Sequence, residues 1–344
     1  MNSTLPGSFY TLPENYAREI ERFFVQGWVA VGREEQVREA GQHFVCDIAG
    51  ESVIVTRDVA GQLRAHFNVC RHRGTRMCLE SHGKFKNAIT CPYHGWTYGL
   101  DGTLMSAPQM PAEFRRADYS LHSVAVTAWQ GHLWVNLSGA APPLELPSLF
   151  DNWRMQELVR RERIVYNVGC NWKLIISNYN ECLHCPLVHP SLNRLTDYLG
   201  ADNDVGSASC FGGDMGFRND AQTMSETGRL TRAYLPGLDE RERKLVRYYT
   251  LLPNLLLSLH PDYMMTHTLW PRGVDRTEVV CEWSFHPSER GDIRDAVDFW
   301  DRTNREDWEM CERSQLGISS RAYRPGAYSP REELLERFDR IVEG

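Results

Sequence analysis

Two cysteines and two histidines within residues 68–98 have the spacing of a metal site. Cys70-x-His72 is followed, after eighteen residues, by Cys91-x-x-His94. Thiolates and imidazoles together are ligands for a transition metal. Because each short loop supplies one cysteine and one histidine, one iron of a [2Fe–2S] cluster can take both sulfurs and the other iron both nitrogens. This mixed ligation raises the reduction potential above that of an all-thiolate cluster.

Two other interpretations fit the same residue types. A tetrahedral zinc site can use the same four ligands, and cysteines in β domains are often small buried hydrophobic residues. Zinc modules, however, usually take both cysteines from one loop and both histidines from another element, so we favour the cluster. Cys78 and His82 lie between the two motifs and belong to neither, and we expect them to be non-ligands. Tyr93 and Trp96 are expected to shield the cluster.

A second set, Glu181, His184 and His189, has the spacing E-x-x-H-x-x-x-x-H. On a regular helix the two histidines lie about 140° apart around the axis, so they can bind one ion only if the helix is distorted between them. Pro186 supplies a distortion, because it lacks an amide donor and clashes with the preceding turn. Taken alone, the pair fits two ordinary histidines near a helix end equally well. The upstream motif favours a metal site.

Two histidines and one carboxylate form the facial triad that binds non-haem Fe(II) and leaves positions open for O2. We expect the acid on a long helix over residues 290–317. At about 100° per residue, Asp307 lies within about 60° of Trp300 on an apolar stripe, whose other members are Ile293, Ala296, Val297, Asn304 and Cys311. An acid in such a stripe is costly unless it is paired or binds a metal. Asp301, at the stripe's edge, and Glu306, on the far side, fit solvated carboxylates better.

These candidate residues must be positioned by folded domains. The stretch 13–24 has the apolar spacing of a helix. Between Trp28 and Leu137, short β-rich runs separated by turn signals predict a small antiparallel domain that carries the first motif. The segment 138–148, rich in small residues and proline, is the best candidate for a linker.

The remaining residues are expected to form a second domain. Residues 171–185 predict a helix interrupted at Pro186, residues 244–270 predict strands, and residues 290–317 predict one long helix. The run GGDMG at 212–216 lacks the spacing and the strand context of a dinucleotide-binding loop. A nicotinamide-binding fold within this chain is therefore not expected.

The composition agrees with a folded chain of two domains. The 344 residues are 42% hydrophobic and 24% charged, with 38 Lys and Arg against 45 Asp and Glu. The acidic excess argues against nucleic-acid binding, and no apolar run is long enough for a membrane helix. Because the N-terminus lacks a signal peptide, we expect a cytoplasmic protein whose ten cysteines are ligands, catalytic or core residues rather than disulfides. Three of them are expected to be packing residues beside the second set: Cys182, Cys185 and Cys311.

The runs CRHRG from Cys70 and CPYHGW from Cys91 are similar to the signature of Rieske-type iron–sulfur proteins, with a slightly longer gap between them. Together with the second set, they make the chain resemble the catalytic α subunit of Rieske non-haem iron oxygenases over nearly its whole length. The resemblance implies an α+β fold in three parts. Residues 1–40 form an N-terminal helix and lead-in strand that pack on the catalytic domain. Residues 41–140 form the antiparallel β Rieske [2Fe–2S] domain, and residues 141–344 form a catalytic domain with an antiparallel sheet flanked by helices.

The resemblance also implies metal ligands and partners. One cluster iron is bound by two thiolates and the other by two imidazoles: Cys70 and Cys91, then His72 and His94. A mononuclear Fe(II) is bound by His184, His189 and Asp307. The enzyme would use O2 as co-substrate and receive electrons from a separate NAD(P)H-dependent reductase of the flavin or ferredoxin type.

Two further residues receive roles by the same resemblance. Glu181 lies where the family places an acid, often Asp, that bridges a cluster histidine of one subunit to an iron ligand of its neighbour. Asn178, one helical turn earlier, is expected to line the iron pocket. Bridging between subunits implies a homo-oligomer, a trimer in members that have only α subunits.

The sequence is most similar to the branch of the family that oxidises quaternary ammonium compounds such as glycine betaine, choline, carnitine or proline betaine. These reactions hydroxylate an N-methyl group or an adjacent carbon, and N-methyl hydroxylation leads to demethylation. Aromatic faces attract such cations, and the candidates in the second domain are Phe211, Phe217, Tyr263 and Trp270. Two alternatives stay open: hydroxylation of an aromatic ring or acid, and an electron-transfer or zinc-binding module without oxygenase activity.

Overall fold

The computed structural model describes residues 3–344, and the chain divides into two compact units. The β unit comprises Ile20–Glu145, and the α+β unit comprises the residues up to Glu19 together with Leu146–Gly344. The second boundary lies inside the proposed linker, 138–148. Of residues 1–40, those beyond Glu19 belong to the β unit, where strand β1 (Val29–Arg33) pairs its backbone with β10 (His132–Asn136).

The β unit is built from antiparallel strands. Its larger sheet has the order β1-β10-β9-β4-β3-β2-β5, and a smaller sheet has the order β6-β7-β8. The remaining strands are β2 (Gln42–Ile48), β3 (Glu51–Arg57), β4 (Leu63–Phe67), β5 (His82–Lys84), β6 (Ala88–Thr90), β7 (Thr97–Gly99), β8 (Leu104–Ser106) and β9 (Ser123–Trp129). The first cysteine motif follows β4, and the second joins β6 to β7. The predicted antiparallel domain is therefore confirmed.

The α+β unit contains one seven-stranded antiparallel sheet in the order β11-β17-β16-β15-β14-β13-β12. The strands are β11 (Val159–Val168), β12 (Asp202–Asp204), β13 (Cys210–Gly216), β14 (Leu245–Leu251), β15 (Leu255–Leu259), β16 (Met264–Gly273) and β17 (Arg276–Phe285). Every residue of β15, Leu-Leu-Leu-Ser-Leu, is buried. A continuous apolar run of this kind occurs where both faces of a sheet are covered.

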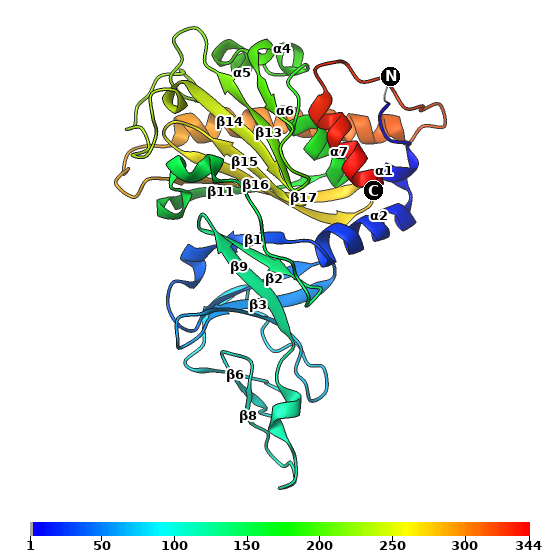
Figure 1. The fold of residues 1–344 in the computed structure, drawn as a ribbon, viewed down its shortest axis with the longest axis vertical. Helices are drawn as coiled ribbons and strands as arrows, with labels where there is room; N and C mark the ends of the chain where they lie inside the picture. The colour runs from blue at the N-terminus through cyan, green and yellow to red at the C-terminus, as the bar shows by residue number, and fades with distance from the viewer. Residues whose placement is uncertain (1–2) are drawn as a thin grey trace. The chain divides into compact units, whose positions relative to one another are not determined.

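The α+β unit also contains helices. They are α1 (Ser8–Thr11), α2 (Pro13–Glu19), α3 (Trp172–Tyr179), α4 (Cys185–Val188), α5 (Pro190–Leu195), α6 (Arg294–Ile318) and α7 (Glu333–Glu343). The long helix α6, orange in Figure 1, contacts α3 and β11, and its buried side chains include the predicted apolar stripe. None of the helices in residues 3–344 is long and apolar enough to cross a membrane.

A buried ion pair fastens the N-terminal helix α2 to α3. The Lys173 ammonium lies 2.6 Å from a carboxylate oxygen of Glu19, and both side chains are almost completely buried. The same Glu19 oxygen accepts a hydrogen bond from Trp172 Nε1 at 3.1 Å, and Lys173 also donates to Asn171 Oδ1. Burial lowers the pKa of Lys173 to about 8, although Glu19 opposes this shift.

Replacement of Glu19 by alanine is expected to destabilise the α+β unit by about 3–5 kcal/mol, because it leaves a buried ammonium without its counter-ion. Denaturant unfolding followed by tryptophan fluorescence measures the loss. The double variant Glu19→Gln/Lys173→Met keeps an oxygen acceptor for Trp172 and should recover most of the stability. Equal destabilisation in both variants would show that the pair contributes through shape alone.

Candidate metal centres

The two cysteine loops of the β unit have the same backbone turn. The Gly74 N–H donates to the Cys70 carbonyl at 3.0 Å, and the Gly95 N–H donates to the Cys91 carbonyl at 3.2 Å. Both glycines have positive φ, 75° and 70°, which side-chain-bearing residues rarely adopt. The repeated turn places each cysteine at the same point of its loop.

The predicted cluster ligands separate into two thiols and two imidazoles. Cys70 and Cys91 are both 2% exposed and belong to the same cluster of buried residues. The rings of His72 and His94 lie 4.6 Å apart, centroid to centroid. The buried Nδ1 of His72 has no hydrogen-bond partner among the described residues, as expected of an atom reserved for a metal. The donor set therefore fits a [2Fe–2S] cluster with one thiolate iron and one imidazole iron.

The spacing of these four side chains argues against one zinc ion. With zinc–ligand distances of about 2.0–2.3 Å, the ligand atoms of a tetrahedral site must all lie about 4 Å or less from one another. Across residues 3–344, the one group of three or more potential ligands gathered within 4.8 Å is His184, His189 and Asp307. No three of the four cysteine and histidine side chains of the β unit form such a group.

Aromatic rings cover the imidazole side of the cluster residues. Trp96 stacks on His72 with 4.8 Å between ring centroids, and Tyr93 lies 3.7 Å from His94. Trp96 is buried, whereas Tyr93 is 57% exposed. The His94 ring is therefore near the surface of the unit. Cys78, which lies between the two motifs, contacts Nε2 of His43 at 3.3 Å.

His184 and His189 lie at the two ends of the one-turn helix α4. The expected helix over residues 171–185 ends earlier, because α3 stops at Tyr179. Pro186 does not break a helix but lies in the first turn of α4, where its missing N–H is not required. The two histidines can face one point because each lies outside regular helix.

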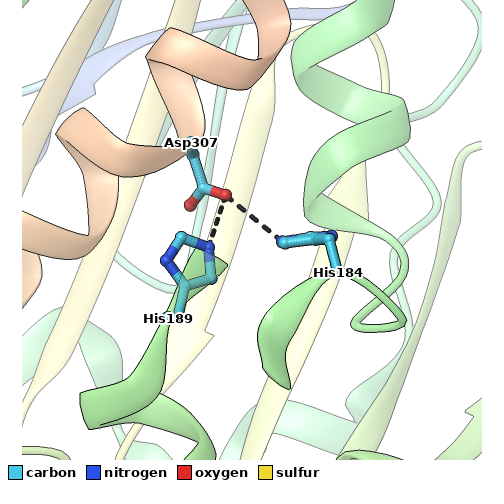
Figure 2. Close-up of side chains that lie close together, drawn as sticks. All are labelled: His184, His189 and Asp307. Carbon is cyan, nitrogen blue, oxygen red and sulfur yellow. Dashed lines mark hydrogen bonds and ion pairs between the residues drawn. The ribbon is translucent and has the colours of Figure 1, made fainter. Parts of the chain in front are cut away.

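The third member of the group is Asp307 of α6. Its Oδ1 lies 2.8 Å from His189 Nε2 and 3.3 Å from His184 Nε2. Figure 2 shows this single oxygen facing both imidazoles. Asp301, the sequence's alternative, instead accepts hydrogen bonds from the Tyr166 hydroxyl at 2.7 Å and from Arg305. Two imidazoles and one carboxylate converging in this way are the ligand set of non-haem Fe(II).

A second carboxylate holds the outer nitrogen of each histidine. His184 Nδ1 lies 2.5 Å from Glu181, and His189 Nδ1 lies 2.7 Å from Glu306. A carboxylate at Nδ1 keeps the proton there and leaves the Nε2 lone pair free for a metal. The expectation that Glu306 is solvated on the far side of α6 is wrong, because its side chain is long enough to reach the buried His189. The sequence signal that could have indicated this contact is the pair of adjacent acids Glu306 and Asp307, which contact the two ring nitrogens of His189.

The charges of this group favour a cation. Burial by itself lowers the pKa of His184, but the carboxylates of Asp307 and Glu181 outweigh it and raise the value to about 10. Burial raises the pKa of Asp307, and hydrogen bonds from the two histidines reverse the shift and lower it. Protons therefore balance the carboxylates when no metal is bound, and a metal ion can take their place. His184, His189 and Asp307 therefore fit a bound Fe(II) ion.

Cys182 and Cys185, on either side of His184, are joined in a disulfide. The expectation that they are separate packing residues is wrong for both. The other eight cysteines are free.

A cavity of about 390 Å³ opens beside the triad. Its wall contains the three triad residues, Glu181 and, as expected, Asn178. Four aromatic side chains also line it: Tyr179, Tyr198, Tyr248 and Trp300.

The four aromatic residues proposed from the sequence do not line this cavity. Phe211 is buried and packs against Phe338 of α7. Tyr263 lies behind the wall, where its hydroxyl accepts a hydrogen bond from Trp300 Nε1 at 2.7 Å. The guanidinium of Arg272 lies over the ring of Trp270. Phe217 forms an isolated antiparallel β-bridge with Thr196. Aromatic composition could not distinguish side chains of the core from those that line the cavity.

Two family descriptions match the sequence. Residues 27–127 match the "Rieske [2Fe-2S] domain", and residues 155–343 match the "Ring hydroxylating alpha subunit (catalytic domain)". Each match coincides with one of the two units and contains that unit's candidate metal ligands.

Curated proteins and solved structures agree with these matches. The glycine betaine monooxygenase oxygenase subunit of Chromohalobacter salexigens is 31% identical over 95% of this chain and 82% of its own length. The chloroplastic choline monooxygenase of Arabidopsis thaliana is 28% identical over 98% and 81%. The quaternary ammonium Rieske monooxygenase CntA, in complex with L-carnitine, has the same fold, with a TM-score of 0.82 and 24% identity over 99% of this chain and 94% of its own.

Proposed function

The chain belongs to the ring-hydroxylating α-subunit family of Rieske oxygenases, and on this basis we propose that it hydroxylates a small quaternary ammonium compound with O2. Hydroxylation on an N-methyl group would release formaldehyde and leave the demethylated amine. The relatives named as glycine betaine, choline and carnitine monooxygenases support this substrate class.

The observation that carries the proposal is the lining of the cavity beside the triad. Tyr248 of β14 and Trp300 of α6 both line it, and their rings lie 6.2 Å apart at 70° to each other. Aromatic faces in this arrangement attract an ammonium group without requiring a hydrogen-bond donor, which a quaternary nitrogen lacks.

Charges at the rest of the wall act in the same direction. Apart from Asp307 and Glu181, the lining holds three carboxylates and one guanidinium: Asp202, Asp214, Glu333 and Arg331. The excess of negative charge favours a cationic ligand. Arg331 offers a partner for the carboxylate that betaine-type substrates carry.

We propose that each part of the site has a separate task. When bound, the mononuclear iron activates O2 beside the substrate and the cluster supplies single electrons. Glu181 and Glu306 keep the protons of His184 and His189 on Nδ1. Trp300 and Tyr248 hold the substrate cation next to the triad.

Electrons are proposed to come from a separate NAD(P)H-dependent reductase. We further propose a homotrimer in which Glu181 connects the iron site of one subunit with the cluster of its neighbour. A structure of the related CntA is described in terms of inter-subunit electron transfer, which supports this arrangement.

Purified protein supplied with a surrogate reductase is expected to release formaldehyde from at least one methylated quaternary amine and to leave aromatic acids unchanged. The screen scores formaldehyde and ring-hydroxylated products in parallel. Ring hydroxylation without formaldehyde would support the aromatic alternative. A colourless protein that contains zinc would overturn the oxygenase assignment as a whole.

The variant Trp300→Leu tests the cation-binding wall. Loss of a desolvated cation–π contact costs up to about 2 kcal/mol, so KM should rise by about tenfold to thirtyfold with a smaller change in kcat. Phe211→Leu is the matched control, since Phe211 belongs to the same unit but does not line the cavity, and its KM should stay unchanged.

A further inference from the structure

The disulfide Cys182–Cys185 encloses His184, a member of the triad. The Cα atoms of the two cysteines lie 5.0 Å apart, and the sequence between them is only Leu183-His184. None of the roles proposed for the oxygenase reaction uses these two sulfur atoms.

The disulfide closes the turn that orients His184. The Cys185 N–H donates to the Cys182 carbonyl at 3.1 Å, so the same four residues are joined by a backbone hydrogen bond and by the sulfur bridge. Glu181 is tied to this turn by both carboxylate oxygens, which lie 2.5 Å from Leu183 N and 2.5 Å from His184 Nδ1. The turn therefore determines where the imidazole of His184 points.

Small molecules in the cavity can reach this sulfur pair. Cys182 and Cys185 both line the cavity beside the triad, and Cys182 is partly exposed. Seven of the eight free cysteines are buried, and the eighth is Cys46 of the β unit. The pKa of its thiol is raised to about 12, chiefly by burial, which makes it a poor nucleophile.

We propose that Cys182 and Cys185 form a reversible thiol–disulfide site, oxidised by hydrogen peroxide and reduced by a dithiol, and that the disulfide holds His184 in its metal-binding position. In the forward direction the two thiols lose two electrons and two protons as the S–S bond forms. The O–O bond of peroxide breaks, and two water molecules result. In the reverse direction a dithiol supplies two electrons and two protons and becomes a disulfide itself. The inference rests on the proposed function only in taking the triad to be an iron site.

The test uses the full-length, iron-loaded protein without substrate. One sample is treated with hydrogen peroxide and another with dithiothreitol, and both are desalted under anaerobic conditions. Iodoacetamide labelling with peptide mass analysis reads the thiols, and a ferrous chelator reads the release of iron. We expect no label on either cysteine after peroxide and label on both after dithiothreitol. The reduced protein should lose its mononuclear iron about tenfold faster, as after loss of an outer-shell contact, with the cluster spectrum unchanged.

The double variant Cys182→Ser/Cys185→Ser should release iron at the fast rate after either treatment. The matched control Cys46→Ser, which removes the one free cysteine that is not classed as buried among the described residues, should behave like the unaltered protein. Labelling of both cysteines after peroxide would overturn the proposal. Equal rates of iron release from oxidised and reduced unaltered protein would also overturn it, whether or not the double variant folds. Because no substrate is present, failure of the substrate screen leaves this result unaffected.

Discussion

Replacement of Asp307 by alanine is expected to abolish turnover and to remove the mononuclear iron while leaving the cluster spectrum intact. Asp307 Oδ1 faces both imidazole Nε2 atoms, at 2.8 and 3.3 Å, so its loss removes the carboxylate of the triad. Loss of an outer-shell partner already costs about 10–100-fold, and loss of a ligand should exceed this. Iron content should fall from about three atoms per chain to about two, the number held by the cluster.

Asp301→Ala is the matched control, because Asp301 lies on the same helix and accepts hydrogen bonds from Tyr166 and Arg305. This variant should keep about three iron atoms and most of its activity. Iron analysis and the visible spectrum of both variants decide the assignment. Iron loss in Asp301→Ala but not in Asp307→Ala would show that the third ligand has been misassigned.

Replacement of Glu181 by glutamine is expected to leave both metal sites loaded and to lower turnover by about 100-fold, the upper range for an outer-shell contact. The glutamine oxygen can still accept the proton of His184 Nδ1, but it lacks the charge of the carboxylate. If Glu181 also connects subunits, reoxidation of the reduced cluster in the presence of substrate and O2 should slow by a similar factor. Stopped-flow absorbance of the cluster measures this step directly.

Glu306→Gln separates the bridging role from simple orientation of an imidazole. Glu306 holds His189 as Glu181 holds His184, but it does not occupy the family's bridging position. Its glutamine variant should reoxidise the cluster at nearly the unaltered rate. If both variants slow reoxidation equally, Glu181 acts only by orienting its histidine. Unchanged turnover in Glu181→Gln would refute both roles.

The spacing of residues in the sequence was sufficient to predict a site where residues close in sequence are also close in space. The Cys70 and Cys91 motifs each lie within one short turn, so their residue types alone indicated a cluster site. The helical period of residues 290–317 likewise placed Asp307 on an apolar stripe, which is buried on helix α6. Predictions failed where a residue's environment depends on distant segments. Tyr263 and Phe211 were indistinguishable in sequence from aromatic residues that line a cavity, and the side chain of Glu306 was long enough to leave the face on which its helical angle placed it.

The sequence by itself determined which chemical groups this protein possesses: two Cys–His loops, a Glu–His–His segment and an acid on an apolar helix face. Only the tertiary structure decided which of these groups meet. Asp307 and His189 are separated by 118 positions, and their contact depends on how α6 packs beside α3 and the sheet rather than on any local preference. The early end of α3 and the short α4 turned both histidines toward Asp307. The same turn brought Cys182 and Cys185 together in a disulfide, although the expected cytoplasmic location had argued against one. The geometry of a short motif depends on the backbone of a few consecutive residues. The geometry of the metal site depends on how side chains of remote elements pack together.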